Sequence, residues 1–180
     1  MLGPVFIIIW ICVRLESKGP ALFLQTRVGL NEKDFRLFKF RTMYLNAEAK
    51  GQLTVGMKDP RITGVGYFLR KYKLDELPQL FNVLKGDMSL VGPRPEVKKY
   101  VNLYTKEQKI VLSVRPGITD YASIAFINEN ELLAKAENPE KYYIEHIMQE
   151  KLALNLSYIN SRLLFKDVIL IWKTLIKIVF

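Results

Sequence analysis

The residues best suited to chemistry are two adjacent carboxylates, Asp75 and Glu76, which stand just before Pro78. Apolar residues recur at helical spacing from position 74 to 84, which predicts a helix there. Proline fits only the first turn of a helix, so we expect Asp75 at or near the N-cap and Gly86 at the C-terminal end. Consecutive helical residues diverge by about 100°, so the two carboxylates are expected to take distinct roles.

Basic residues accompany this pair. They are Arg70, Lys71, Arg94 and Arg115. Pro93 and Pro95 restrict the backbone around Arg94, which predicts a guanidinium pre-positioned for bidentate contact with phosphate. A helix cap is the commoner use of a lone aspartate, but cations around an ionised carboxylate are the arrangement for phosphoryl transfer, usually with Mg²⁺ bridging the phosphates.

The charge distribution points to an anionic partner. The 180 residues carry a formal charge of +9, and residues 14–115 hold 20 Lys and Arg against 10 Asp and Glu. Nucleic acid, a phosphate-bearing substrate and acidic lipid all fit such a segment. With Cys12 and His146 the only residues of their kinds, acid–base and nucleophilic chemistry is expected to fall mainly to carboxylates.

Both ends of the chain are apolar. The run Val5–Val13 has no charge and as a helix would be about 14 Å long, too short for a bilayer core of roughly 30 Å. It is either a buried core segment or one that enters a single leaflet and returns, with Pro4 at the bend. Residues 163–180 combine an apolar face, a tryptophan and a narrow lysine stripe, which is typical of an interfacial helix, although a core helix with snorkelling lysines has the same pattern. Together the two ends favour a monotopic membrane protein.

A β-hairpin is expected between these ends. Residues 21–28 and 35–43 have strand composition and flank a polar loop. An extended second strand would place Lys39 and Arg41 on one face, either as phosphate ligands or as solvated cations of an edge strand. Residues 46–66 contain glycine, proline and charge and are expected to form a surface loop.

Three stretches carry a family resemblance. They are Lys39–Met43, Leu74–Pro95 and Arg115–Thr119. In this order they resemble the bacterial sugar transferase family, the monotopic phosphoglycosyl transferases. The resemblance implies transfer of a sugar 1-phosphate from a UDP-sugar to a membrane polyprenyl (undecaprenyl) phosphate with release of UMP, the initiating step of bacterial surface-glycan assembly. It also implies Mg²⁺ or Mn²⁺ as cofactor, with Asp75 as a metal ligand.

The resemblance also assigns roles to residues. Asp75 would be the nucleophile that forms an aspartyl-phosphosugar, and Glu76 would complete a catalytic dyad, in an acid–base or metal-binding role. The residues expected to bind phosphates, nucleotide or substrate are Lys39, Arg41, Arg70, Pro93, Arg94, Pro95, Arg115 and Asp167. An acid within the apolar terminal segment needs a partner, which favours the active site for Asp167 over a lipid-facing position.

The chain departs from the family pattern in three places. It starts just before Gly3-Pro4, without the first arm of the family's re-entrant helix, so we expect either a truncated chain or a different mode of anchoring. Residues 120–123 read Asp-Tyr-Ala-Ser where members commonly have Gly-Trp-Ala-Gln, and an acidic insert then runs to about position 150 with a helix start at Asn138-Pro139. Asn155 stands where an aspartate is common. These differences concern sugar specificity and anchoring.

We therefore expect an α+β protein that is mainly helical with a small β-hairpin. Residues 1–15 would form a partial re-entrant membrane segment, and residues 16–180 a single catalytic domain ending in a membrane-surface helix. The expected partners are a UDP-sugar, polyprenyl phosphate and anionic lipids of the inner leaflet, at the cytoplasmic face of the inner membrane; a homo-oligomer is left open. A basic nucleic-acid-binding module is the alternative, but it leaves the apolar ends and the dyad unused, so no nucleic acid is expected. A catalytically silent membrane scaffold of the same fold is disfavoured by the intact dyad and Arg94.

Overall fold

The computed structural model describes residues 3–47, 51, 53–56 and 59–179. Its α-helices are α1 (Gly3–Glu16), α2 (Gly64–Lys71), α3 (Gln79–Lys85), α4 (Lys98–Val101), α5 (Tyr121–Ala125), α6 (Glu129–Lys135), α7 (Pro139–Tyr142), α8 (Met148–Asn160) and α9 (Leu164–Val179). The strands are β1 (Leu22–Val28), β2 (Asp34–Phe40), β3 (Ser89–Val91) and β4 (Gly117–Thr119). Short 3-10 helices are η1 (Leu30–Glu32), η3 (Leu74–Glu76) and η4 (Gln108–Ser113), and η5 (Tyr143–Ile147) is a π-helical turn. The expected mixture of many helices with little sheet is confirmed.

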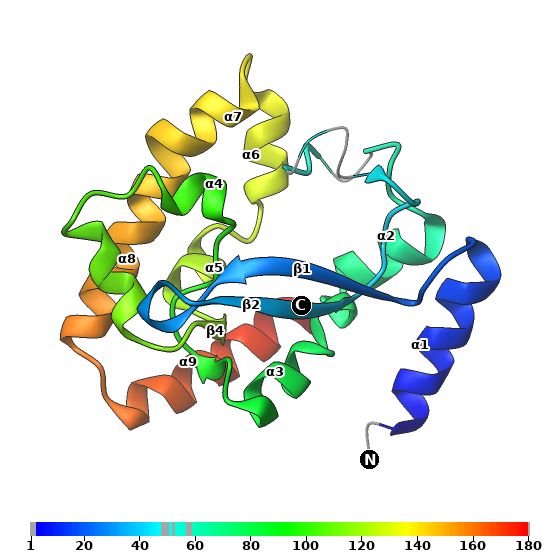
Figure 1. The fold of residues 1–180 in the computed structure, drawn as a ribbon, viewed down its shortest axis with the longest axis horizontal. Helices are drawn as coiled ribbons and strands as arrows, with labels where there is room; N and C mark the ends of the chain where they lie inside the picture. Colours follow the sequence, from blue (N-terminus) through cyan, green and yellow to red (C-terminus); the bar gives the residue numbers. More distant parts are fainter. Residues whose placement is uncertain (1–2, 48–50, 52, 57–58, 180) are drawn as a thin grey trace.

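The β1–β2 hairpin crosses the middle of the molecule (Figure 1). Its strands pair antiparallel, from Leu22 opposite Phe40 to Val28 opposite Asp34. The second strand ends three residues earlier than predicted, and beyond it Met43 forms an isolated antiparallel bridge with Ile62. Arg41 lies one residue past the end of β2, and its backbone N–H still donates to the Ala21 carbonyl oxygen at 2.8 Å.

A short parallel pair, β3–β4, lies beside the hairpin layer. Ser89 pairs with Gly117 and Val91 with Thr119. A Cβ atom on Gly117 would lie 2.1 Å from the Gly92 nitrogen, so the close approach of the two backbones requires glycine there. Because the strands are parallel, the segments that follow them leave at the same edge.

The segment that carries the two carboxylates is not one helix. After α2 the chain turns through Lys73, which has a left-handed backbone with φ of 54°, into η3 and then α3. The hydrogen bonds at the turn join residues three apart, from Glu76 N–H to Lys73 O and from Leu77 N–H to Leu74 O. Pro78 is the N-cap of α3 and Asp75 lies in η3, so the predicted capping position for Asp75 is wrong; the expected end at Gly86 (φ 83°) is confirmed.

Two further boundaries can be compared with the sequence. The helix start predicted at Asn138-Pro139 is confirmed, because the Asn138 side chain accepts a hydrogen bond from Lys141 N–H at the start of α7. The predicted loop over 46–66 ends slightly earlier, since Thr63 caps α2 and Gly64 begins it. Residues 48–50, 52 and 57–58 of that loop lie outside the described residues.

Two hydrophobic clusters form most of the core. The larger joins α4, η4, η5 and α8 and contains Val97, Tyr100, Val101, Val111, Leu112, Tyr143, Ile147, Met148 and Leu152. The smaller packs α1 against the hairpin and α2, through Ile9, Val13, Ala21, Phe40 and Leu69. The hairpin is therefore held between an α8-centred layer and the α1–α2 pair.

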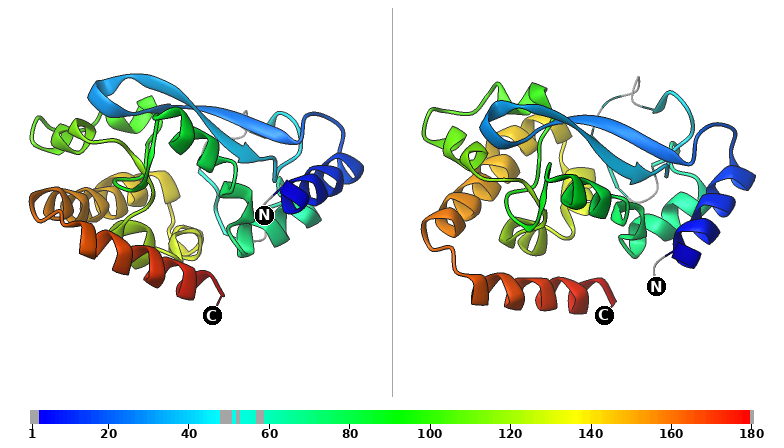
Figure 2. Two further views of the ribbon diagram at one scale, coloured as in Figure 1. Left: turned by 90° about the horizontal axis from the view of Figure 1, so that it is seen from below. Right: turned by 60° about the horizontal axis from the view of Figure 1, so that its bottom comes forward.

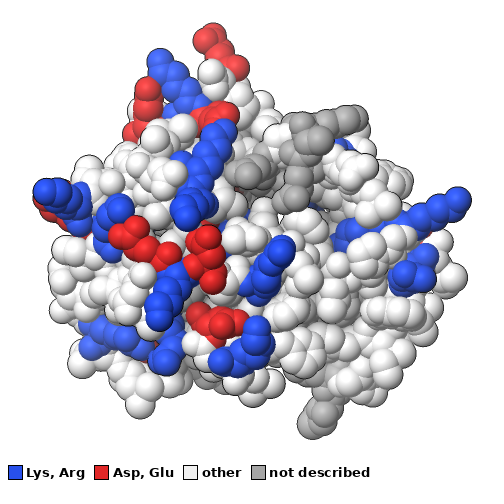
Figure 3. Space-filling model, in the orientation of Figure 1, with Lys and Arg blue, Asp and Glu red and all other residues white. Residues whose placement is uncertain are grey.

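Helices α1 and α9 leave large apolar side chains exposed. Trp10 of α1 and Trp172 of α9 are 48% and 63% exposed, whereas Leu170 of α9 is buried. In both views of Figure 2, α9 runs along the lower side and its C-terminal end points toward the side of α1. In Figure 3 the lower right of the face, over α1, is largely uncharged, while acidic and basic side chains gather at the left and centre.

None of the helices in the described ranges is long and apolar enough to cross a membrane. Pro4 lies in the first turn of α1, and a bend ahead of it would fall on residues 1–2, which are outside the described residues. The re-entrant geometry therefore stays a prediction.

Candidate active site

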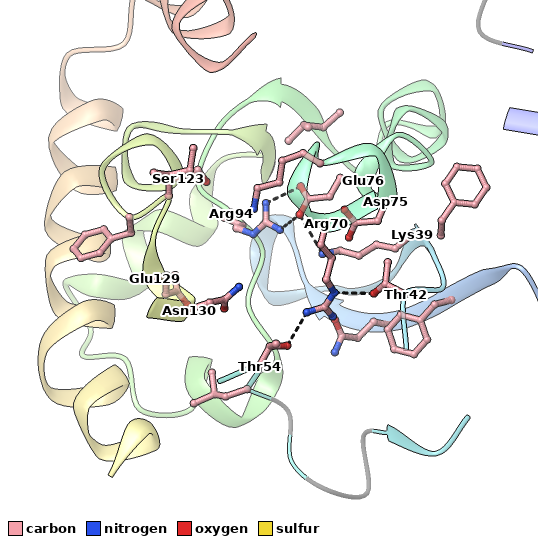
Figure 4. A pocket seen from close by; sticks show the side chains of 18 of the residues that line it. Lys39, Thr42, Thr54, Arg70, Asp75, Glu76, Arg94, Ser123, Glu129 and Asn130 are labelled. Atoms are coloured by element: carbon pink, nitrogen blue, oxygen red, sulfur yellow. Dashed lines mark hydrogen bonds and ion pairs between the residues drawn. The ribbon is translucent and has the colours of Figure 1, made fainter. Parts of the chain in front are cut away.

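A cavity of about 960 Å³ lies beside η3. The hairpin and η3 form one side of it, the segment after β3 a second, α5 and α6 a third, and the C-terminal half of α9 contributes apolar side chains. Figure 4 shows Asp75 and Glu76 on one side and Ser123, Glu129 and Asn130 on the other. This volume accommodates a ligand of several hundred Å³.

Both carboxylate oxygens of Glu76 accept hydrogen bonds from cationic side chains. Arg94 donates from Nη1 to Glu76 Oε2 at 3.0 Å and from Nη2 to Oε1. Lys39 Nζ also lies 3.3 Å from Oε1. Burial alone would raise the pKa of Glu76, but attraction by Arg94 and Lys39 holds it well below its ordinary value. Glu76 is therefore an ionised anchor whose oxygens are already occupied.

Asp75, its neighbour, is buried but unpaired. The residue is 6% exposed, and its Oδ1 has no hydrogen-bond partner among the described residues. Burial and repulsion by Glu76 raise its pKa, against the opposing attraction of Lys39 and Arg70. A carboxylate without hydrogen-bonded compensation is a stronger base and nucleophile than one held by arginine.

Lys39 and Arg70 complete the cationic side of the cavity (Figure 4). Arg70 Nε donates to Thr42 Oγ1 at 2.8 Å and Arg70 Nη1 to Thr54 Oγ1 at 3.1 Å. Burial lowers the pKa of Lys39, which Glu76 partly offsets. Since Arg70 bonds only hydroxyls among the described residues, its charge stays available to an anionic ligand.

Arg94 reaches the site from the turn Gly92–Pro95 after β3. Arg27 Nη1 donates to the Pro95 carbonyl at 3.0 Å, and Gly117 N–H donates to the Pro93 carbonyl at 3.0 Å. The carbonyl oxygens of the two prolines thus anchor the turn to β1 and β4. The guanidinium, expected to grip phosphate, grips Glu76 instead in this state.

Three of the residues expected to bind substrate are engaged elsewhere. Arg41 lines the cavity, but its guanidinium donates to the carbonyl oxygens of Lys18 and of Ser17 (2.7 Å), just after the end of α1. Arg115 is exposed and donates from Nε to Gly86 O at 3.0 Å, and Asp167 Oδ1 accepts from the Tyr158 hydroxyl at 2.8 Å.

Neither Arg115 nor Asp167 lies among the described residues that line the cavity. The parallel pairing explains Arg115. It precedes β4 and so lies at the amino edge, whereas Arg94 follows β3 at the carboxyl edge.

Comparison with known proteins now decides the family. The chain matches the bacterial sugar transferase family over residues 1–180, its whole length. The protein belongs to the bacterial sugar transferase family. The resemblance carried by the three sequence stretches is thereby confirmed.

The names of individual relatives of this sugar transferase describe undecaprenyl-phosphate sugar phosphotransferases. It is 39% identical over 178 residues to a UDP-N-acetylgalactosamine-undecaprenyl-phosphate N-acetylgalactosaminephosphotransferase of Aeromonas hydrophila, covering 97% of this chain and 39% of that protein. It is 35% identical over 177 residues to a UDP-glucose:undecaprenyl-phosphate glucose-1-phosphate transferase of Caulobacter vibrioides, covering 97% of this chain and 62% of that protein. The chain thus spans about two fifths to three fifths of the length of these curated relatives.

Several residues of the sugar transferase site were not predicted from the sequence. Thr42 and Thr54 orient Arg70, and Thr54 gave no signal because it stands in an irregular loop. Asp120 accepts from the Arg94 backbone N–H; in the sequence it stood out only as a departure from the family pattern. The wall around Asn130 comes from the insert, which the sequence placed without locating it at the cavity.

A cation at the site would depend on few protein ligands. Among the described residues no group of three or more His, Cys, Asp or Glu gathers. Mg²⁺ characteristically keeps several waters and uses one or two carboxylates together with substrate phosphates. Asp75 lines the cavity, and its Oδ1 has no hydrogen-bond partner among the described residues, so its carboxylate fits that mode, whereas the occupied oxygens of Glu76 do not.

Proposed function

We propose that the chain is a phosphoglycosyl transferase. It transfers a sugar 1-phosphate from a UDP-sugar to undecaprenyl phosphate through an intermediate on Asp75 and releases UMP, the first step of assembling a bacterial surface glycan. The observation that carries this proposal is the asymmetry of the dyad: Glu76 is held by Arg94 and Lys39, whereas Asp75 Oδ1 is buried, unpaired and beside a cationic cavity. The names of the relatives support the same reaction.

In the first half-reaction, an Asp75 carboxylate oxygen attacks the phosphorus that bears the sugar. The new bond is carboxylate oxygen to phosphorus, and the phosphoanhydride bond to UMP breaks, so UMP leaves with the bonding electron pair. Arg70 and Lys39 would offset the charge that gathers on the phosphoryl oxygens, the main task of a protein in phosphoryl transfer. Among the described residues Oδ1 has no hydrogen-bond partner, so no such bond would have to break before this carboxylate reacts.

In the second half-reaction, a phosphate oxygen of the polyprenyl phosphate attacks the same phosphorus. The acyl phosphate bond breaks, Asp75 regains its carboxylate, and the product is a polyprenyl diphosphate sugar. The lipid would reach the cavity past α9, whose Ile171 and Leu175 line it. Splitting the transfer in two lets a water-soluble donor and a lipid acceptor use one site in turn.

Mg²⁺ or Mn²⁺ would be held by Asp75 and the donor's diphosphate. When bound it would neutralise phosphate charge that otherwise repels the carboxylate. Glu76 would not join it as a ligand while Arg94 and Lys39 occupy its oxygens.

The exposed apolar faces of α1 and α9 support a monotopic placement on the cytoplasmic face of the inner membrane. Tryptophan and lysine around an apolar face are typical of helices at the bilayer interface. The exposed cations outside the cavity would face anionic headgroups. Arg41 would then couple α1 to the catalytic hairpin.

The test is UMP release from a panel of UDP-glucose, UDP-galactose and UDP-N-acetylgalactosamine, with the full chain in bilayer nanodiscs. With undecaprenyl phosphate present, we expect multiple turnovers for at least one donor. Without acceptor we expect at most one UMP per protein molecule, since the intermediate has nowhere to go. No UMP from any UDP-sugar with acceptor present would contradict the proposal.

A further inference from the structure

We propose that Asp120 is a positioning residue that seats the Arg94 guanidinium on Glu76 by holding the backbone of the turn after β3. The activity readout of this proposal rests on the phosphoglycosyl transferase function above. The carboxyl edge of the parallel strands brings the two segments together: Arg94 follows β3, and Asp120 follows β4 directly.

The two oxygens of Asp120 bind different elements. Oδ1 accepts from Ser123 N–H at 2.6 Å and so caps α5, while Oδ2 accepts from Arg94 N–H at 3.1 Å. Asp120 is 1% exposed, and burial of an acid is costly unless it is paired. A serine or asparagine would cap the helix equally well, so the cap does not explain the carboxylate. The second oxygen, aimed at the Arg94 backbone, does.

The rest of the turn is held by backbone groups of β4 and by one cation. Gly92 N–H donates to Thr119 O at 3.0 Å, Pro93 O accepts from Gly117, and Pro95 O accepts from Arg27 Nη1. Among the described residues, Arg94 N–H is the turn's donor to a side-chain carboxylate. With these bonds the Cα of Arg94 is fixed on both sides. A two-pronged contact such as Arg94 on Glu76 depends on that placement, because its geometry is set by a rigid fork.

The charges around Arg94 favour the same arrangement. Attraction by Glu76 raises the pKa of Arg94 against the effect of burial, and Asp120 and Glu129 add to it. Asp120 thus acts on Arg94 in two ways, through the backbone bond and through its charge. Because Arg94 bonds Glu76, both effects help to keep Glu76 bonded while Asp75 Oδ1 has no partner among the described residues.

The test uses Asp120→Asn, which keeps the shape and the cap but replaces Oδ2 by a group that cannot accept from Arg94 N–H. We expect kcat/KM for UMP release to fall about tenfold in the otherwise native chain. In the Arg94→Lys background, where no two-pronged contact with Glu76 exists, the same change is expected to cost less than twofold. Equal factors in the two backgrounds would overturn the proposal, because a merely structural role does not depend on Arg94.

A second cycle needs no substrate. We expect Asp120→Asn to lower the free energy of unfolding more in the native chain than in the Glu76→Gln background, since both act through Arg94. Additive effects would overturn the proposal even if the chain released no UMP, and absence of UMP alone would count only against the proposed function. Asp120→Ser replaces Asp120→Asn if the latter does not fold. Asn138→Ala, which removes a cap from α7 far from the turn, is the matched control and is expected to leave kcat/KM unchanged.

Discussion

The two sides of the η3 turn differ sharply although they are adjacent in sequence. On the Glu76 side, Arg94 and Lys39 occupy both carboxylate oxygens and lower the pKa of the acid. On the Asp75 side, burial and the neighbouring charge raise the pKa and Oδ1 meets no partner in the described part of the chain. One carboxylate is therefore held by cations at both oxygens, whereas the other has an unbonded buried oxygen, a difference that residue types alone do not reveal.

The largest differences between Asp75 and Glu76 are expected when each carboxylate is replaced in turn by its neutral amide. Asp75→Asn is expected to lower UMP release by roughly 10⁴-fold or more, as loss of a nucleophile does, and to raise Tm, because it removes a buried unpaired charge. Glu76→Gln is expected to lower activity and also cost about 3 kcal/mol of unfolding free energy, because it leaves Arg94 and Lys39 without their partner. Thermal and urea unfolding with UMP assays on both variants measure the pair of effects.

The expected increase in Tm on Asp75→Asn should depend on pH. A buried acid with a raised folded pKa destabilises the native state above that pKa, and the cost disappears once it is protonated. The Tm advantage of Asp75→Asn should therefore shrink as pH falls through the raised pKa. If Asp75→Asn and Glu76→Gln destabilise the chain alike at neutral pH, the two sides are not different in the way described.

A smaller effect is expected at the cation that separates the two sides. Arg94→Lys keeps the charge but loses the fork that binds both Glu76 oxygens, so we expect kcat/KM to fall by roughly 10²-fold. The matched control is Arg115→Lys, the other arginine beside a proline, which is exposed and bonds Gly86 O. It should change kcat/KM less than about twofold, within the usual range for surface substitutions. Similar losses of kcat/KM in Arg94→Lys and Arg115→Lys would contradict the view that only the arginine at the carboxyl edge of β3–β4 takes part in catalysis.

Much of the site was predictable because it depends on local sequence. The hairpin was predicted from two strand-like runs around a polar loop, and the helix end at Gly86 from the frequent use of glycine at helix C-termini. The dyad with Lys39, Arg70 and Arg94 was recognisable from residue type and motif, and the structure brings all five together.

The remainder depends on long-range packing. Arg41 donates to carbonyl oxygens after α1, in a segment more than 20 residues away in sequence. The parallel pairing of β3 with β4 separates Arg94 from Arg115 and joins Asp120 to Arg94. Three-residue strands carry too little periodicity for such pairing to be predicted from sequence.

The most direct test of the account is the mass of the full chain after incubation with a turned-over UDP-sugar and divalent cation in the absence of acceptor. We predict that the protein gains the mass of one sugar phosphate, that peptide analysis places it on Asp75, and that undecaprenyl phosphate removes it. Asp75→Asn should gain no mass, and Arg115→Lys should gain it as the native chain does. A native chain that turns over donor with acceptor present but carries the adduct on Glu76, or on no residue, would contradict the assignment of Asp75 as the nucleophile.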